Sequence, residues 1–307
     1  MQRFMQLETV IRRAPLGLRF VDIIRDVTVS DSLLVQAWQK GAIGSAAGSK
    51  QTALVSPLSG VYGFRSLPGL ARYENGEGQP SDWCGSPADG SSPDDWASSG
   101  ALYGWASAAE NGAKANFIIT VEDAQRRFLP AMLFLCLPRE RLLEVPLISS
   151  PARSPLAGFG VIRGQLARHD SPQLAKPLPA GWATVTAILG NRAYESVADA
   201  RGIFVIFVPY ARFPALQNRG SQQDGDYIAQ LMWDVTLQVS YQPSQLIFVP
   251  GVDQPDMRSI ITQGRAGVYQ QADHPASELN AQLPFGRDLV VTTERQQSVL
   301  FVDPALP

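Results

Sequence analysis

The chain has 307 residues, of which 45% are hydrophobic and 18% charged, and its formal net charge at pH 7 is −2. This length suits two domains that each bury a core, and the lack of any basic block excludes electrostatic binding of nucleic acid. The longest apolar run, residues 128–138, is too short to cross a bilayer, so membrane insertion is not expected. The N-terminal residues lack the apolar centre of a signal peptide, and we therefore expect assembly in the cytoplasm.

Glycine and proline punctuate short apolar runs along the whole chain, which is typical of a mainly β protein. The runs predict strands, in chain order, at 18–24, 33–38, 52–55, 61–65, 117–121, 131–137, 160–166, 183–189, 194–198, 203–208, 233–239, 245–249, 288–293 and 299–302. Strict alternation in 233–239 predicts one apolar face, made of Trp233, Val235, Leu237 and Val239. Trp38 and Trp182 lie in strand patterns and are expected in the core. Helix signals are weak, at 30–39 and 224–234.

Two segments, 55–64 and 197–206, share one pattern and predict two copies of the same unit. In each segment a strand ends, a tight turn closes on Gly60 or Gly202, and a new strand begins. Glycine suits such turns because they often require positive φ. The repeat extends to either side, where 34–38 matches 183–187 and 116–137 matches 232–249.

The Pro- and Ser-rich segment 146–155 is a predicted linker between the two copies. We therefore predict two tandem β-sandwich domains, residues 1–150 and 151–307. A long loop insertion interrupts each domain, at 71–114 in the first and at 251–282 in the second. Loops of this length in a compact domain are usually functional or disordered.

Three stretches of the second half, 160–164 (GVIRG), 179–183 (PAGWA) and 198–204 (ADARGIF), resemble the carboxypeptidase regulatory-like, or transthyretin-like, β-sandwich family. The resemblance covers residues 160–210 well. It is weaker over 16–69, where Pro57-Leu58-Ser59-Gly60 replaces the acidic turn. It implies tandem Ig-like/transthyretin-like sandwiches that serve as spacers or docking modules, and it indicates no particular activity.

A second resemblance rests on the order of three longer stretches: VPLISSPARSPLAGFGVIRGQL, then WATVTAILG, then SVADARGIFVIFVPY. In this order they are similar to accessory proteins encoded with extracellular contractile injection systems, which are phage-tail-like particles. The resemblance implies a particle component near the baseplate or cap. Such a component would dock partner subunits through loops and strand edges and leave the cell as part of the particle.

Candidate catalytic and metal-binding side chains are few. His169 and His274 lie in predicted loops and have no partners in the sequence, so each is expected to be a solvated histidine. Asp123 and Asp199 are expected to satisfy backbone groups in turns. Calcium could bind four acidic residues of the first insertion, but their spacing fits no EF-hand and a solvated loop is favoured: Asp82, Asp89, Asp94 and Asp95. The sequence therefore predicts no enzyme, no catalytic residue, no metal and no cofactor.

The first insertion carries the best candidate binding site. It is poor in aliphatic residues, yet Trp83, Trp96, Tyr103 and Trp105 supply large aromatic side chains. Such rings pack on their own domain, anchor a protein interface or stack on a sugar. We therefore predict a structural or assembly protein whose aromatic loop binds other protein subunits, with a carbohydrate-binding or adhesion module as the alternative.

Overall fold

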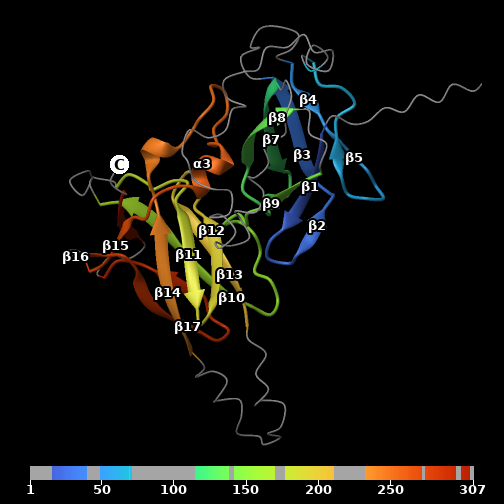
Figure 1. Cartoon of the computed structure of the whole chain (residues 1–307). Coiled ribbons are helices and arrows are strands. Elements are labelled where there is room, and N and C mark those ends of the chain that lie inside the picture. Colours follow the sequence, from blue (N-terminus) through green and yellow to red (C-terminus); the bar gives the residue numbers. More distant parts are fainter. Residues whose placement is uncertain are drawn as a thin grey trace, which may run out of the picture.

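The computed structural model describes residues 16–39, 49–68, 70, 115–137, 142–169, 177–210, 232–271, 274–294 and 299–304. Within these residues the fold is mainly β, as predicted. The strands form two groups, which we call the first unit (residues 17–147) and the second unit (residues 159–303). In Figure 1 the blue and green strands of the first unit lie at the upper right, and the yellow to red strands of the second unit lie at the lower left.

The first unit contains two sheets. One sheet has five strands: β1 (Gly17–Asp22), β2 (Val27–Val29), β5 (Leu54–Val55), β6 (Tyr62–Gly63) and β9 (Leu143–Leu147). The other sheet has four strands: β4 (Gln51–Thr52), β3 (Leu33–Gln39), β7 (Ala115–Asp123) and β8 (Ala131–Leu137). In the first sheet β1 is central. It pairs in parallel with β9 and antiparallel with β2 and β6.

The second unit also contains two sheets. The larger is built from β10 (Phe159–Arg168), β13 (Ile203–Pro209), β15 (Gly267–Gln271), β16 (His274–Ala276), β18 (Leu289–Val291) and β19 (Leu300–Asp303). The smaller is built from β12 (Arg192–Val197), β11 (Thr184–Leu189), β14 (Met232–Ser240) and β17 (Leu279–Pro284). Two short helices, η4 (Pro243–Gln245) and α3 (Met257–Ile261), lie between β14 and β15.

The two units repeat the same strand pairings. The first strand of each unit pairs in parallel with its last strands, β1 with β9 and β10 with β18 and β19. It pairs antiparallel with the strand after the glycine turn, which is β6 or β13. The other sheets run in the equivalent orders β4-β3-β7-β8 and β12-β11-β14-β17. Gly60 and Gly202 both have positive φ, +66° and +77°. The pairings therefore bear out the repeat that these turns indicated.

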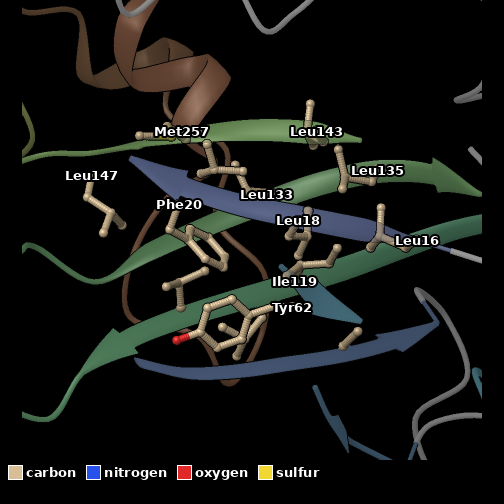
Figure 2. Close-up of a cluster of buried hydrophobic side chains, with 14 of the residues drawn as sticks. Leu16, Leu18, Phe20, Tyr62, Ile119, Leu133, Leu135, Leu143, Leu147 and Met257 are labelled. Carbon is tan, nitrogen blue, oxygen red and sulfur yellow. The ribbon is translucent and has the colours of Figure 1, made fainter. Parts of the chain in front are cut away.

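Each unit buries a core between its two sheets. In the first unit, Phe20 of β1 packs edge-on against Tyr62 of β6, with ring centroids 5.2 Å apart, and both face Ile119 of β7 across the core (Figure 2). In the second unit, Val235, Leu237 and Val239 of β14 are buried on one face, as the alternation predicted. No ladder of paired strands joins the two units among the residues the structure describes, and the exact domain boundary after residue 150 remains a prediction.

The segment 251–282, predicted as a loop insertion, contains α3, β15, β16 and most of β17. The strand predicted at 245–249 is wrong, because that stretch holds the end of η4 and irregular chain. The true insertion spans residues 241–278, since β17 and not 245–249 occupies the place that β8 has in the first unit. Pattern reading missed these strands because they are short and carry polar residues, Gly or Pro.

Substitution of Gly202 by Ala should destabilise the chain strongly. A Cβ at Gly202 would collide with the carbonyl oxygen of Leu166, and the residue would be held at φ +77°. We expect the free energy of unfolding to fall by about 3 kcal/mol or more, measured by chemical denaturation. Gly190→Ala is the matched control, because φ there is +59° but no atom lies within 4 Å of the new Cβ. Its expected cost is about 1 kcal/mol, and equal losses for both variants would contradict the steric argument.

Candidate functional site

The four residues predicted to bind partners, Trp83, Trp96, Tyr103 and Trp105, lie outside the described residues. The acidic residues considered for calcium lie outside them as well. The binding role of the segment 71–114 therefore stays a prediction. The described part of the chain shows a different feature, a contact between the two units.

This contact is made by residues 241–264 of the second unit, which we call the inserted lobe. Buried hydrogen bonds of Gln263 hold the lobe together and join it to its own unit. The side-chain amide of Gln263 donates to the carbonyl oxygens of Trp182 (2.8 Å) and Ile260 (3.0 Å), and its Oε1 accepts the backbone N–H of Gln242 (2.9 Å). The bond to Trp182 and a second one, from the Thr184 hydroxyl of β11 to the Ile260 carbonyl (3.2 Å), join the lobe to the second unit.

The lobe also packs into the first unit. The apolar side of α3, with Met257, Ile260 and Ile261, joins the core of the first unit. Figure 2 shows Met257 beside Leu133, which comes from β8. Side chains from both units thus form one continuous apolar cluster, and separating the units would expose it to water.

A second apolar contact lies on the outer face of the first unit's β4-β3-β7-β8 sheet. Trp38, Ile118 and Met132 project from this face, and Val249 and Val252 of the lobe cover them. The prediction that Trp38 and Trp182 are buried is confirmed. Both lie at the contact between the units, since Trp182 also packs with the first unit's core cluster.

The lobe covers the free edge of β8 as well. Asp256 forms an isolated bridge with Met132, and its Oδ1 accepts the backbone N–H of Phe134 at 3.0 Å. Burial raises the pKa of the Asp256 carboxyl to about 6, although the hydrogen bond from Phe134 acts in the opposite direction. An uncovered edge strand can pair with other chains, and the lobe occupies this edge at Met132 and Phe134.

The predicted linker is not an open connection, because a buried ion pair holds it in place. Arg153 donates to Asp22 Oδ1 of β1 at 3.1 Å, and both side chains are almost fully buried. The guanidinium also lies over the rings of Phe128 and Phe207, 5.0 and 5.7 Å from their centroids. Phe207 belongs to β13 of the second unit, so Arg153 contacts both units at once.

The structure corrects the predicted environment of both histidines. His169 lies in a turn, as predicted, but it has partners: its ring stacks on Tyr269 at a centroid distance of 3.8 Å, and its Nδ1 lies 3.7 Å from Asp303. His274 is exposed but lies in β16 and not in a loop. Burial, with the hydrogen bond that Tyr269 donates to Asp303, raises the pKa of Tyr269 to about 12. The Tyr269 hydroxyl is therefore a proton donor at neutral pH and unsuited to act as a base.

The two aspartates predicted to stabilise turns do so. Asp199 Oδ1 accepts the backbone N–H groups of Arg201 and Ile203, both at 2.9 Å. Asp123 Oδ2 accepts the backbone N–H of Arg127 at 2.6 Å. Burial alone would raise the pKa of Asp123, but the hydrogen bonds from Arg127 lower it below its ordinary value. Both carboxylates thus have structural partners.

An aromatic cluster that sequence reasoning missed lies at one end of the second unit. Tyr210 stacks near Trp233 (5.3 Å between centroids) and against Phe285 (4.6 Å), and all three rings are half-buried. The Tyr210 hydroxyl accepts the backbone N–H of Gly286 at 2.9 Å. The lobe was missed too, although Pro255-Asp256 before an apolar run is a recognisable helix start.

Two further findings concern only the described residues. They contain no group of three or more His, Cys, Asp or Glu side chains that could hold a metal ion. None of their helices is long and apolar enough to cross a membrane.

Comparison with known proteins shows no family. No protein-family model matches the chain, and no curated protein is similar to it. The Bacillus anthracis TIE protein is 9% identical over 88% of this chain, which spans 44% of that protein's length, with a TM-score of 0.19. A mutant of the shaft pilin SpaA from Lactobacillus rhamnosus GG is 8% identical over 95% of this chain and 98% of the pilin, with a TM-score of 0.20. Both TM-scores are too low to carry an argument about function.

Replacing Arg153 by Met should destabilise the protein by about 3–5 kcal/mol, because it leaves the Asp22 carboxylate buried without its cation. Chemical denaturation measures this loss, and the double variant Asp22→Asn/Arg153→Met should recover part of it. Arg19→Met is the control, since its partner Glu144 is exposed and such a pair contributes at most about 1 kcal/mol. If Arg153→Met costs no more than Arg19→Met, the ion pair does not hold the units.

Proposed function

We propose that this chain is a non-enzymatic structural and assembly protein that docks other protein subunits of a larger particle. The observation that carries the proposal is the inserted lobe, which is fastened to the second unit and covers the core, the outer face and one strand edge of the first. Two units held in this way form a block of fixed shape. A spacer or docking component needs such a shape, because a flexible pair would not hold its partners at a defined distance.

The particle that we propose is a phage-tail-like contractile injection particle, with this chain near the baseplate or cap. The support is the resemblance carried by residues 145–166, 182–190 and 196–210. These residues include Arg153 and Asp199, whose side chains hold the linker and a turn in place, and Trp182, whose backbone carbonyl accepts a hydrogen bond from Gln263. Assembly in the cytoplasm followed by release with the particle belongs to the same proposal.

Two surfaces are proposed to dock partners. One is the aromatic segment 71–114. The other is the β5–β6 hairpin, where Leu54 is 50% exposed, Val55 40% and Leu58 99%. Leu54 and Val55 also line a shallow hollow together with Leu16. Exposed apolar side chains gathered on an edge hairpin are suited to protein contact, in contrast to the covered edge of β8.

A carbohydrate-binding or adhesion module is the second candidate function, and the cluster of Tyr210, Trp233 and Phe285 favours it. Half-buried rings can stack on the apolar face of a sugar, and these three rings come from separate stretches of the second unit. A glycan array followed by a tryptophan-fluorescence titration tests this candidate. Saturable binding of a glycan without any protein partner would favour it over the assembly role.

Double substitution of Trp96 and Trp105 by Ala should weaken assembly with partner subunits and leave the melting temperature of the isolated chain nearly unchanged. The reason is that rings which anchor an interface contribute to binding and little to the fold of the free protein. Co-purification from the native host measures the first effect, and a thermal melt measures the second. A lowered melting temperature with intact assembly would show that the rings are internal core.

Substitution of Leu54 and Leu58 by Ser should also weaken assembly at constant stability. Leu58 is almost fully exposed, so its loss removes very few internal contacts and should change the free energy of unfolding by less than about 0.5 kcal/mol. The control is Val290→Ser, which removes a 56% exposed apolar side chain from the second unit. If both variants retain partners equally well, the hairpin is not a docking surface.

A further inference from the structure

Asp256 is the most unusual ionisable group among the described residues. It is only 4% exposed, lies at the first residue before α3, and occupies the boundary between the two units. Its carboxylate Oδ1 accepts the Phe134 N–H, which is an outward-pointing donor on the edge strand β8. A carboxylate in this position is removed from water on every side, and the charged form is disfavoured.

The groups around Asp256 show that burial is the dominant influence on the pKa of its carboxyl. From β8, it meets the backbone of Met132 and Phe134, which carries no charge. From the lobe, its own backbone N–H donates to the Ile247 carbonyl at 2.8 Å, and its carbonyl accepts the Ser259 hydroxyl at 2.7 Å. Arg258, on α3, is the charged group that acts on the carboxyl, and its attraction favours the ionised form. Backbone hydrogen bonds from Phe134, Ser259 and Arg258 favour the ionised form too, but burial outweighs all of these and raises the pKa from 3.8 to about 6.

The raised pKa decides whether the contact between lobe and first unit, which we call the docked state, becomes more or less stable as pH changes. Between pH 4 and 6, the docked state binds the proton more tightly than a state in which Asp256 is open to water. The docked state is therefore favoured as pH falls through this window, and it loses that advantage as pH rises towards 7. This is opposite to a salt-bridged carboxylate, which stabilises the folded state above its pKa.

We propose that Asp256 is a pH-responsive latch between the two units, which tightens the inserted lobe on β8 when it takes up a proton and loosens it when it loses one. The carboxyl belongs to the lobe and lies against the edge strand of the first unit. Its ionisation state therefore affects the strength of the contact between the two units. Loosening uncovers the β8 edge and the apolar face of Trp38, Ile118 and Met132. The latch does not depend on the proposed function.

The test is amide hydrogen exchange of the full chain at pH 5.0 and 7.5. The exchange rate of each amide is expressed as a protection factor relative to its intrinsic rate at that pH. The amide of Phe134, which donates to Asp256, reports the opening of the lobe, and the amides of β8 that are bonded to β7 serve as internal controls. With a docked pKa of about 6 and an open pKa of 3.8, the opening constant should be about tenfold larger at pH 7.5 than at pH 5.0. A carbon NMR titration of the Asp256 carboxyl should have its midpoint near 6.

Two variants make the test specific. In Asp256→Asn the side chain cannot ionise, but its amide oxygen can still accept the Phe134 N–H. The protection factor of the Phe134 amide should therefore be the same at both pH values. Asp253→Asn removes an exposed carboxylate three positions away and should keep the tenfold difference. The latch is disproved if wild-type protection does not change, if the carboxyl titrates near its ordinary value, or if Asp256→Asn keeps the pH dependence. Should Asp256→Asn fail to fold, the wild-type titration and the Asp253→Asn comparison still decide.

Discussion

The fold depends on how the edge and outer face of the first unit's β4-β3-β7-β8 sheet are removed from water. A sheet whose last strand is open and whose outer face is apolar would associate with other chains. In this protein the second unit supplies the cover from within the same chain. Val249 and Val252 lie over the face, Asp256 occupies the edge, and Met257 closes the core.

The equivalent sheet of the second unit shows the other solution to the same constraint. Its outer face carries polar pairs between neighbouring strands β14 and β17. Their side-chain contacts are Thr236 with Asn280 (3.0 Å), Asp234 with Gln282 (3.2 Å) and Gln238 with Glu278 (3.4 Å). Such pairs suit a face in contact with water, where cross-strand hydrogen bonds add modest stability. The two copies thus share their strand order while their outer faces differ, and among the described residues the lobe covers the apolar one.

The sequence predicted the parts of the fold that local pattern determines. The turns at Gly60 and Gly202 were recognisable because a tight turn with positive φ selects glycine. Strand β14 was recognisable because its alternation is strict, and Asp199 because an aspartate at that turn pairs with the backbone N–H groups of Arg201 and Ile203. Each of these signals lies within about ten residues of chain.

The contact between the units left a weaker signal in the sequence, the Asp256 that precedes the apolar run of α3. Helix α3 has five residues, too few for a periodic pattern, and its apolar side chains resemble those of an ordinary buried turn. The hydrogen bond from Phe134 to Asp256 joins residues 122 positions apart, and nothing local in either segment announces it. His169 was misread for the same reason, since Tyr269 and Asp303 reach it only through the pairing of β10, β15 and β19.

These long-range contacts bear on function through rigidity. Arg153 lies in the segment that joins the units, where a flexible linker would let them rotate. Its guanidinium pairs with Asp22 of the first unit and lies over the ring of Phe207 of the second. Rotation of one unit against the other would break this arrangement and leave a buried charge without a partner. The lobe also opposes rotation, through the apolar contacts of Met257 and Ile260 with the first unit's core. Two unrelated contacts, one ionic and one apolar, thus resist bending at the junction, which is the mechanical property that the proposed spacer role requires.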